Sequence, residues 1–125
     1  VSNLVICLME MDEDRFEKTL NNAIGHFGFE STVENILFPF LRRLGDMWQV
    51  GMVSPSQEHY ISNLIRQKLI ARLDQVTPAK NPAPSTFLFF LPNTELHEMG
   101  LLYAWYLVKL RGHKCVYLGQ CVPLE

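Results

Sequence analysis

The sequence contains little that would direct this chain to a membrane or to a nucleic-acid backbone. Its longest apolar run, residues 100–108, is far shorter than the roughly 18 to 20 residues that span a bilayer. Lys and Arg number 11 against 13 Asp and Glu, so the chain has no basic excess with which to neutralise phosphates. We therefore expect no membrane span in this chain, and no binding to DNA by this segment alone.

Cysteine is scarce and lacks the spacing of a metal site. Cys7, Cys115 and Cys121 are odd in number and far apart in the sequence. This usage is typical of reduced thiols in a cytoplasmic protein rather than of a disulfide framework. The chain also lacks a phosphate-binding glycine-rich loop, a nucleophile elbow and a Cys-His dyad, so it offers no familiar catalytic motif.

Apolar residues at helical spacing dominate residues 1–76. The pattern predicts a short helix from Ser2 to Glu10, with Ser2 as its N-cap. Residues 11–14, acidic at positions 12–14, offer a cap and an acidic first turn for a second helix, which should end between Gly25 and Gly28.

Two further helices complete the first part of the chain. Residues 31–34 fit a capping box for the third helix, which should kink at Pro39 and stop near Gly51. A cap, a proline and a glutamine at residues 54–57 are a strong start signal for the fourth helix, which should end near Val76. The sequence thus predicts a four-helix bundle over residues 1–76. Basic residues on the fourth helix, Arg66 among them, are expected to form a solvated face.

The remainder of the chain changes character. Residues 77–84 hold three prolines and no periodicity, which predicts a stiff, extended linker. Residues 85–91 form an uninterrupted apolar run, typical of a strand covered on both faces, and a helix from about Glu95 to Arg111 follows. A second strand over residues 114–119 would pair in parallel with the first, giving a β-α-β unit over residues 85–125. Two strands alone make a poor sheet, so we expect more of this α/β domain in the full-length protein.

A first candidate site lies where the first strand turns into the following helix. In open α/β sheets, ligands bind beyond the carboxyl ends of the strands, and His97 falls there. Glu95 is close enough to orient a metal-bound imidazole, and Gly100 leaves room on the helix surface. A lone histidine is a poor site for a free metal ion but suffices for a pre-assembled metal cofactor that needs one axial ligand. The alternative is a histidine that is merely solvated in the first helical turn.

A second candidate site combines Trp48, Glu58 and His59. The short connection between the third and fourth helices would bring these three residues to the same end of the bundle. A large ring, a carboxylate and an imidazole could line a pocket there. The alternative is ordinary: a tryptophan that anchors the core, a carboxylate that favours the helix N-terminus, and a solvated histidine.

Four stretches resemble one known family. LGDMWQVG at residues 44–51 and QEHYISNLIR at residues 57–66 resemble the helical cap of cobalamin-binding sensor modules in MerR-type transcriptional regulators. PNTELHEMGLL at residues 92–102 and YLGQCVP at residues 117–123 resemble the start of the adjoining flavodoxin-like B12-binding domain. The resemblance covers nearly the whole chain from about Ser31 onward.

The resemblance implies a role for each candidate residue. His97 would be the lower axial ligand of cobalt, Glu95 would hydrogen-bond to it, and Gly100 would let the corrin approach. The upper face of cobalamin, where an adenosyl or methyl group sits, would be covered by Trp48, Glu58 and His59. The implied cofactor is therefore adenosylcobalamin or methylcobalamin.

The resemblance also implies a regulator rather than an enzyme. Such a module would form a homo-oligomer and would reach DNA only through a separate N-terminal domain. The alternative is a corrinoid carrier of a methyltransferase system, but carriers usually have aspartate where this chain has Glu95. Gln49 stands where light-responsive members carry a second histidine, which departs from the photoreceptor pattern. A third possibility is a dimerising or small-molecule-sensing module that uses no cofactor.

Overall fold

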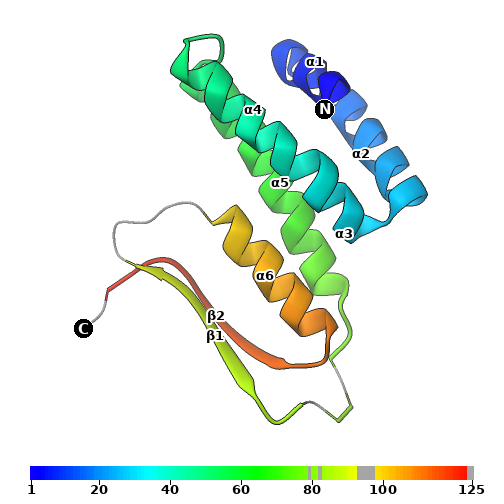
Figure 1. The fold of residues 1–125 in the computed structure, drawn as a ribbon, viewed down its shortest axis with the longest axis vertical. Coiled ribbons are helices and arrows are strands. Elements are labelled where there is room, and N and C mark those ends of the chain that lie inside the picture. Colours follow the sequence, from blue (N-terminus) through cyan, green and yellow to red (C-terminus); the bar gives the residue numbers. More distant parts are fainter. Residues whose placement is uncertain (79, 82, 93–97, 124–125) are drawn as a thin grey trace. The chain divides into compact units, whose positions relative to one another are not determined.

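The computed structural model describes residues 1–78, 80–81, 83–92 and 98–123, which form helices followed by a small α/β unit (Figure 1). They divide into two compact units, Val1–Asn63 and Leu64–Glu125, and the boundary falls inside helix α5 (Pro55–Gln75). The limits predicted from the sequence, a bundle over residues 1–76 and an α/β unit over residues 85–125, were drawn from the proline-rich stretch between them. They stay a prediction. Within the described part of the chain, no helix combines the length and the apolar character needed to cross a membrane.

The first unit is helical, as the sequence predicts. Its elements, in chain order, are α1 (Ser2–Glu10), α2 (Glu13–Phe27), α3 (Phe29–Thr32), the π-helical turn η1 (Val33–Leu37), α4 (Phe38–Gln49) and the beginning of α5. Their apolar faces make one core, and its side chains are at most 3 % exposed: Leu4, Leu8, Phe16, Leu20, Val33, Leu37, Phe40 and Leu44. Phe27, the last residue of α2, is 63 % exposed.

The first residues of α1 and α2 show whether the caps predicted for these two helices are present. Asp12 caps α2 by accepting a hydrogen bond from the backbone N–H of Arg15 at 3.1 Å, as expected for an acidic first turn. The cap predicted at Ser2 is wrong, because Ser2 is already helical and Val1 holds the N-cap position without a side-chain bond. The structure therefore confirms the acidic start of α2 and not the cap at Ser2.

The capping box predicted over residues 31–34 is wrong. Helical backbone begins at Phe29 and continues through η1 into α4, so these residues lie inside the run. The Thr32 hydroxyl donates to the Gly28 carbonyl at 2.7 Å, which is the bond of a threonine within a helix rather than at its cap. The disturbance predicted at Pro39 takes the form of η1, the wider turn just before it, where the Phe38 N–H reaches the Val33 carbonyl.

The second unit contains the predicted β-α-β arrangement. After the last part of α5 come β1 (Thr86–Pro92), α6 (Met99–Leu110) and β2 (Lys114–Val122). β1 and β2 pair in parallel from Thr86 opposite Lys114 to Pro92 opposite Val122, with irregular register beyond Phe89. α6 contacts both strands and lies along one face of this sheet (Figure 1). Gly112, in a left-handed conformation with φ of +88°, ends α6 as predicted.

The expectation that the first strand is covered on both faces is wrong for the described residues. Leu88 is 57 % exposed and its neighbours Phe87 and Phe90 are nearly two-fifths exposed, whereas Phe89 is buried. The reason is architectural, because α6 covers one face and only two strands pair in the described chain. An apolar run shows that a strand can be covered, but other elements must supply the cover.

Candidate cobalamin site

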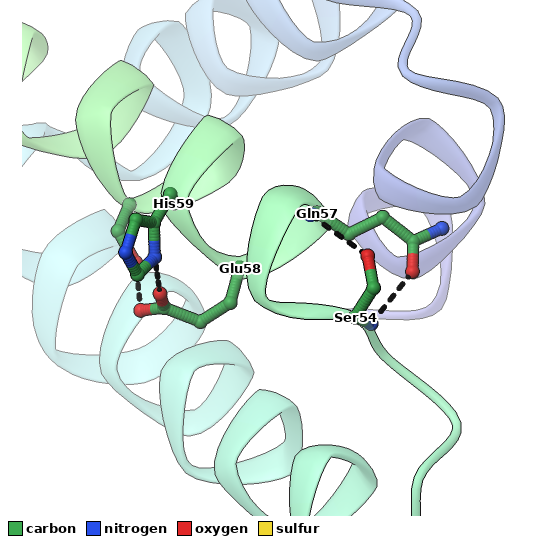
Figure 2. A network of polar contacts seen from close by, with 5 residues as sticks. Ser54, Gln57, Glu58 and His59 are labelled. Atoms are coloured by element: carbon green, nitrogen blue, oxygen red, sulfur yellow. Dashed lines mark hydrogen bonds and ion pairs between the residues drawn. The ribbon is translucent and has the colours of Figure 1, made fainter.

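A capping box sets the start of α5 and so positions two of the predicted site residues. The Ser54 hydroxyl accepts from the Gln57 N–H at 3.2 Å, and the Gln57 side chain accepts from the Ser54 N–H at 2.9 Å (Figure 2). Pro55 occupies the first helical position, where its missing N–H costs nothing. This predicted start is confirmed, and it places Glu58 and His59 in the first turns of the helix.

Glu58 links two neighbours on the same helix. One carboxylate oxygen accepts from the Ser62 hydroxyl at 2.8 Å, and the other lies 2.5 Å from Nδ1 of His59 (Figure 2). An ionised carboxylate only accepts, so the proton of the neutral imidazole belongs on Nδ1 and Nε2 is left as an acceptor. The His59 side chain is 71 % exposed, and its Nε2 can therefore meet a ligand.

Trp48 lies at the end of α4, one connection away from that pair. Gly51, with φ of +76°, turns the chain there: its N–H bonds to the Trp48 carbonyl and the Met52 N–H bonds to the Met47 carbonyl. The indole is 51 % exposed, which contradicts the alternative in which Trp48 anchors the core. The structure thus brings a bare aromatic ring and the Glu58–His59 pair to adjoining ends of consecutive helices.

The second group of predicted residues is described only in part. Glu95 and His97 lie outside the described residues, and α6 begins at Met99 within them. Gly100 lies in the first turn of α6, where an added Cβ would meet no atom within 4 Å. The helix surface at Gly100 is therefore open enough for a bulky group to approach.

A further polar network was missed by sequence reasoning. Nε of Arg66 donates to one oxygen of Glu98 at 2.7 Å, and the Tyr117 hydroxyl donates to the other at 2.7 Å. Glu98 is only 9 % exposed, whereas the Arg66 side chain is 46 % exposed, so Arg66 lies on a solvated face as predicted but also forms an ion pair that was not predicted. No local pattern could pair Arg66 with Glu98, because 32 positions separate them.

The protonation of this network follows from its partners. Burial by itself would raise the pKa of Glu98, but the hydrogen bonds from Tyr117 and Arg66 outweigh it and hold the pKa below its usual value of 4.5. Burial and the adjacent carboxylate both raise the pKa of the Tyr117 hydroxyl. At neutral pH, a charged Glu98 thus accepts from a protonated Tyr117.

Comparisons with known proteins identify a family. A family model described as B12 binding domain matches residues 2–72. Two relatives from Myxococcus xanthus are similar: the HTH-type transcriptional repressor CarH is 30 % identical over 91 % of this chain, and the HTH-type transcriptional repressor CarA is 31 % identical over 90 %. The chain spans 37 % of the length of each relative.

The family match covers the helices that carry the exposed tryptophan and the Glu58–His59 pair, and it extends over more than half of the chain. The resemblance noted in the sequence is thereby confirmed at the level of the cofactor, which is cobalamin. This chain belongs to the family of B12-binding domains.

Proposed function

We propose that this chain is the cobalamin-binding sensor module of a transcriptional regulator. The observation that carries the proposal is the exposed Trp48 indole near the end of α4 together with the hydrogen-bonded Glu58–His59 pair near the start of α5, in a B12-binding family member. The regulatory role is supported by two relatives whose names describe HTH-type transcriptional repressors. In this proposal the chain acts by binding, not by catalysis.

The cofactor suits the residues that the structure describes. Cobalamin, when bound, would supply a cobalt centre that can take a protein imidazole as a ligand. The open surface at Gly100 leaves space for a macrocycle. We assign His97 as the lower axial ligand and Glu95 as the carboxylate that orients its ring, because a metal-bound histidine usually donates its other N–H to such a group.

The helical cap would cover the upper face. Trp48 offers a rigid apolar plane, which can exclude water from an upper ligand with little loss of side-chain freedom. His59 presents Nε2 as an acceptor while Glu58 holds its other ring nitrogen. An upper ligand with a hydrogen-bond donor would satisfy that nitrogen.

Regulation would follow from a change in populations rather than from chemistry. Cofactor that binds one arrangement of the protein more tightly than another shifts the balance toward it. We propose that the balance concerns a homo-oligomer, and that a separate N-terminal domain reads the DNA. The present chain would be the part that senses the cofactor.

A spectroscopic titration tests the axial ligand. Full-length protein is titrated in the dark with adenosylcobalamin and with methylcobalamin, using the wild type, His97→Ala, and His26→Ala as a matched control at the exposed end of α2. We expect wild type and His26→Ala to show the spectral change of a protein imidazole replacing the cofactor's own base, and His97→Ala to lack it. An unchanged spectrum in His97→Ala would show that another residue is the ligand.

A further inference from the structure

Glu98 occupies an unusual position for a buried carboxylate. It holds the N-cap position of α6, where the side chain of a Ser, Thr, Asp or Asn usually accepts from the free N–H groups of the first turn. Glu98 makes no such side-chain bond. Both of its oxygens are instead committed to Arg66 on α5 and Tyr117 on β2. The carboxylate therefore anchors the chain at this point to two other elements of the second unit.

The surroundings of the anchor are closely packed. The Tyr117 ring stacks on Trp105 of α6, with ring centroids 4.3 Å apart and planes 14° from parallel. A Cβ at Gly119 would lie 3.6 Å from the Tyr117 ring and 3.8 Å from a Glu98 oxygen. Aromatic stacking holds the tyrosine so that its hydroxyl stays aimed at Glu98. The anchor is thus supported by α5, α6 and β2 together.

We propose that Arg66 and Tyr117 are positioning residues for cofactor binding. They hold Glu98, which directly follows His97 in the sequence. The inference rests on the proposed function, in which His97 is the cobalt ligand. Neither Arg66 nor Tyr117 needs to touch the cofactor for this role.

The physical reason is the free-energy cost of ordering a binding segment. A ligand-bearing segment that is anchored before binding loses less conformational freedom when the ligand arrives, so affinity rises without a new contact. Partners that orient a metal ligand from behind typically change affinity by about 10- to 100-fold when they are removed. A similar effect is expected if the anchor serves binding.

Tyr117→Phe is the cleanest variant, because it removes the hydroxyl and keeps the ring that stacks on Trp105. The matched control is Lys109→Met, which removes another contact of the second unit: Nζ of Lys109 donates to the Leu73 carbonyl at 3.0 Å. That contact also joins α6 to α5 but lies near the far end of α6. Adenosylcobalamin affinity and thermal stability are measured on the full-length protein for the wild type and both variants.

We expect Tyr117→Phe to weaken affinity by about tenfold while the spectrum at saturating cofactor stays that of the wild type. Lys109→Met should lower thermal stability by about as much as Tyr117→Phe does, because each variant removes one hydrogen bond. Its affinity for adenosylcobalamin should stay within about twofold of the wild type. Hydrogen exchange of the cofactor-free protein adds a second measurement, in which Tyr117→Phe should speed exchange of the Leu102 N–H, the donor to the Glu98 carbonyl.

The possible failures are distinguishable. If the wild type binds cobalamin and Tyr117→Phe binds it equally well, the positioning role is wrong and the proposed function stands. If Lys109→Met weakens binding as much as Tyr117→Phe does, the effect reflects general stability and the inference is again wrong. If the wild type binds no cobalamin, both the proposed function and this inference fall.

Discussion

Glu58 and Glu98 are two carboxylates that each hold two polar partners, but they do so in opposite surroundings. Glu58 pairs with His59 and Ser62, both within four positions on the same helix, and the His59 side chain is mostly exposed. Glu98 pairs with Arg66 and Tyr117, which are 32 and 19 positions away, and its own side chain is 10 % exposed. We call the first network open, because it is local and its histidine is 71 % exposed, and the second closed, because it is tertiary and its carboxylate is buried, although Arg66 is 46 % exposed.

This difference in burial suits the two carboxylates to different roles. Side chains that are paired within one exposed helix can release a partner to a ligand, because water and neighbouring turns compensate for the loss. A buried carboxylate that releases a partner leaves that partner without a hydrogen bond, at a larger cost. Glu58 is thus suited to contact a ligand, and Glu98 is suited to hold the structure around one.

The largest expected effect is on stability. Glu98→Ala should lower the free energy of unfolding by about 2 kcal/mol, because it leaves the Tyr117 hydroxyl and Nε of Arg66 without their acceptor. Glu58→Ala should cost about 0.5 kcal/mol, as expected for an exposed pair. Urea unfolding of both variants measures the difference. Equal costs would remove the distinction between the two networks.

The pH dependence of stability should show the same closed network. The pKa of Glu98 is lowered in the folded protein, so its charged form stabilises the fold above the unfolded value of about 4.5, and this contribution is lost as the pH falls through the folded pKa. The gap in unfolding free energy between the wild type and Glu98→Gln should therefore shrink as the pH drops from 6 to below 4.5. Lys109→Met, which removes no group that titrates there, serves as the control. A gap that is constant over this range would show that the charge of Glu98 does not matter.

The smallest expected effect concerns the open network. Neutral His59 should carry its proton on Nδ1 while Glu58 accepts it, and Glu58→Ala should shift the ring toward the Nε2–H tautomer. Long-range proton–nitrogen NMR correlations distinguish the two forms. Ser62→Ala, which removes the other partner of Glu58, should leave the tautomer unchanged and cost no more than about 0.5 kcal/mol. A wild-type ring protonated on Nε2 would contradict the proposed geometry.

Much of the helical architecture could be predicted from local sequence. The Ser54–Gln57 capping box, the cap at Asp12 and the stop at Gly51 depend on side chains within a few positions of the bonds they make. The apolar faces of the helices were likewise predictable, since burial of one face follows from period 3.6. The grouping of Trp48, Glu58 and His59 at adjoining helix ends was also predictable, because a short connection joins the two helices that carry them.

Other expectations failed where a competing partner was remote or absent. The capping box at residues 31–34 was wrong because helix formation had already begun at Phe29. The covered strand was wrong because apolar residues such as Leu88 do not specify what packs on them. The roles of Glu95 and His97 stay predictions, since both residues lie outside the described part of the chain.

The sequence by itself determined the helices and the parallel strand pair, because periodicity and caps act over a few residues, and four short stretches carried the resemblance to a cobalamin-binding family. Only the tertiary structure decided the role of Arg66, which looked like one solvated cation among several. Its partner is distant along the chain, and the pairing exists only when α5, α6 and β2 come together. A buried carboxylate takes the donors that the fold brings to it, and the sequence order of those donors leaves no local trace.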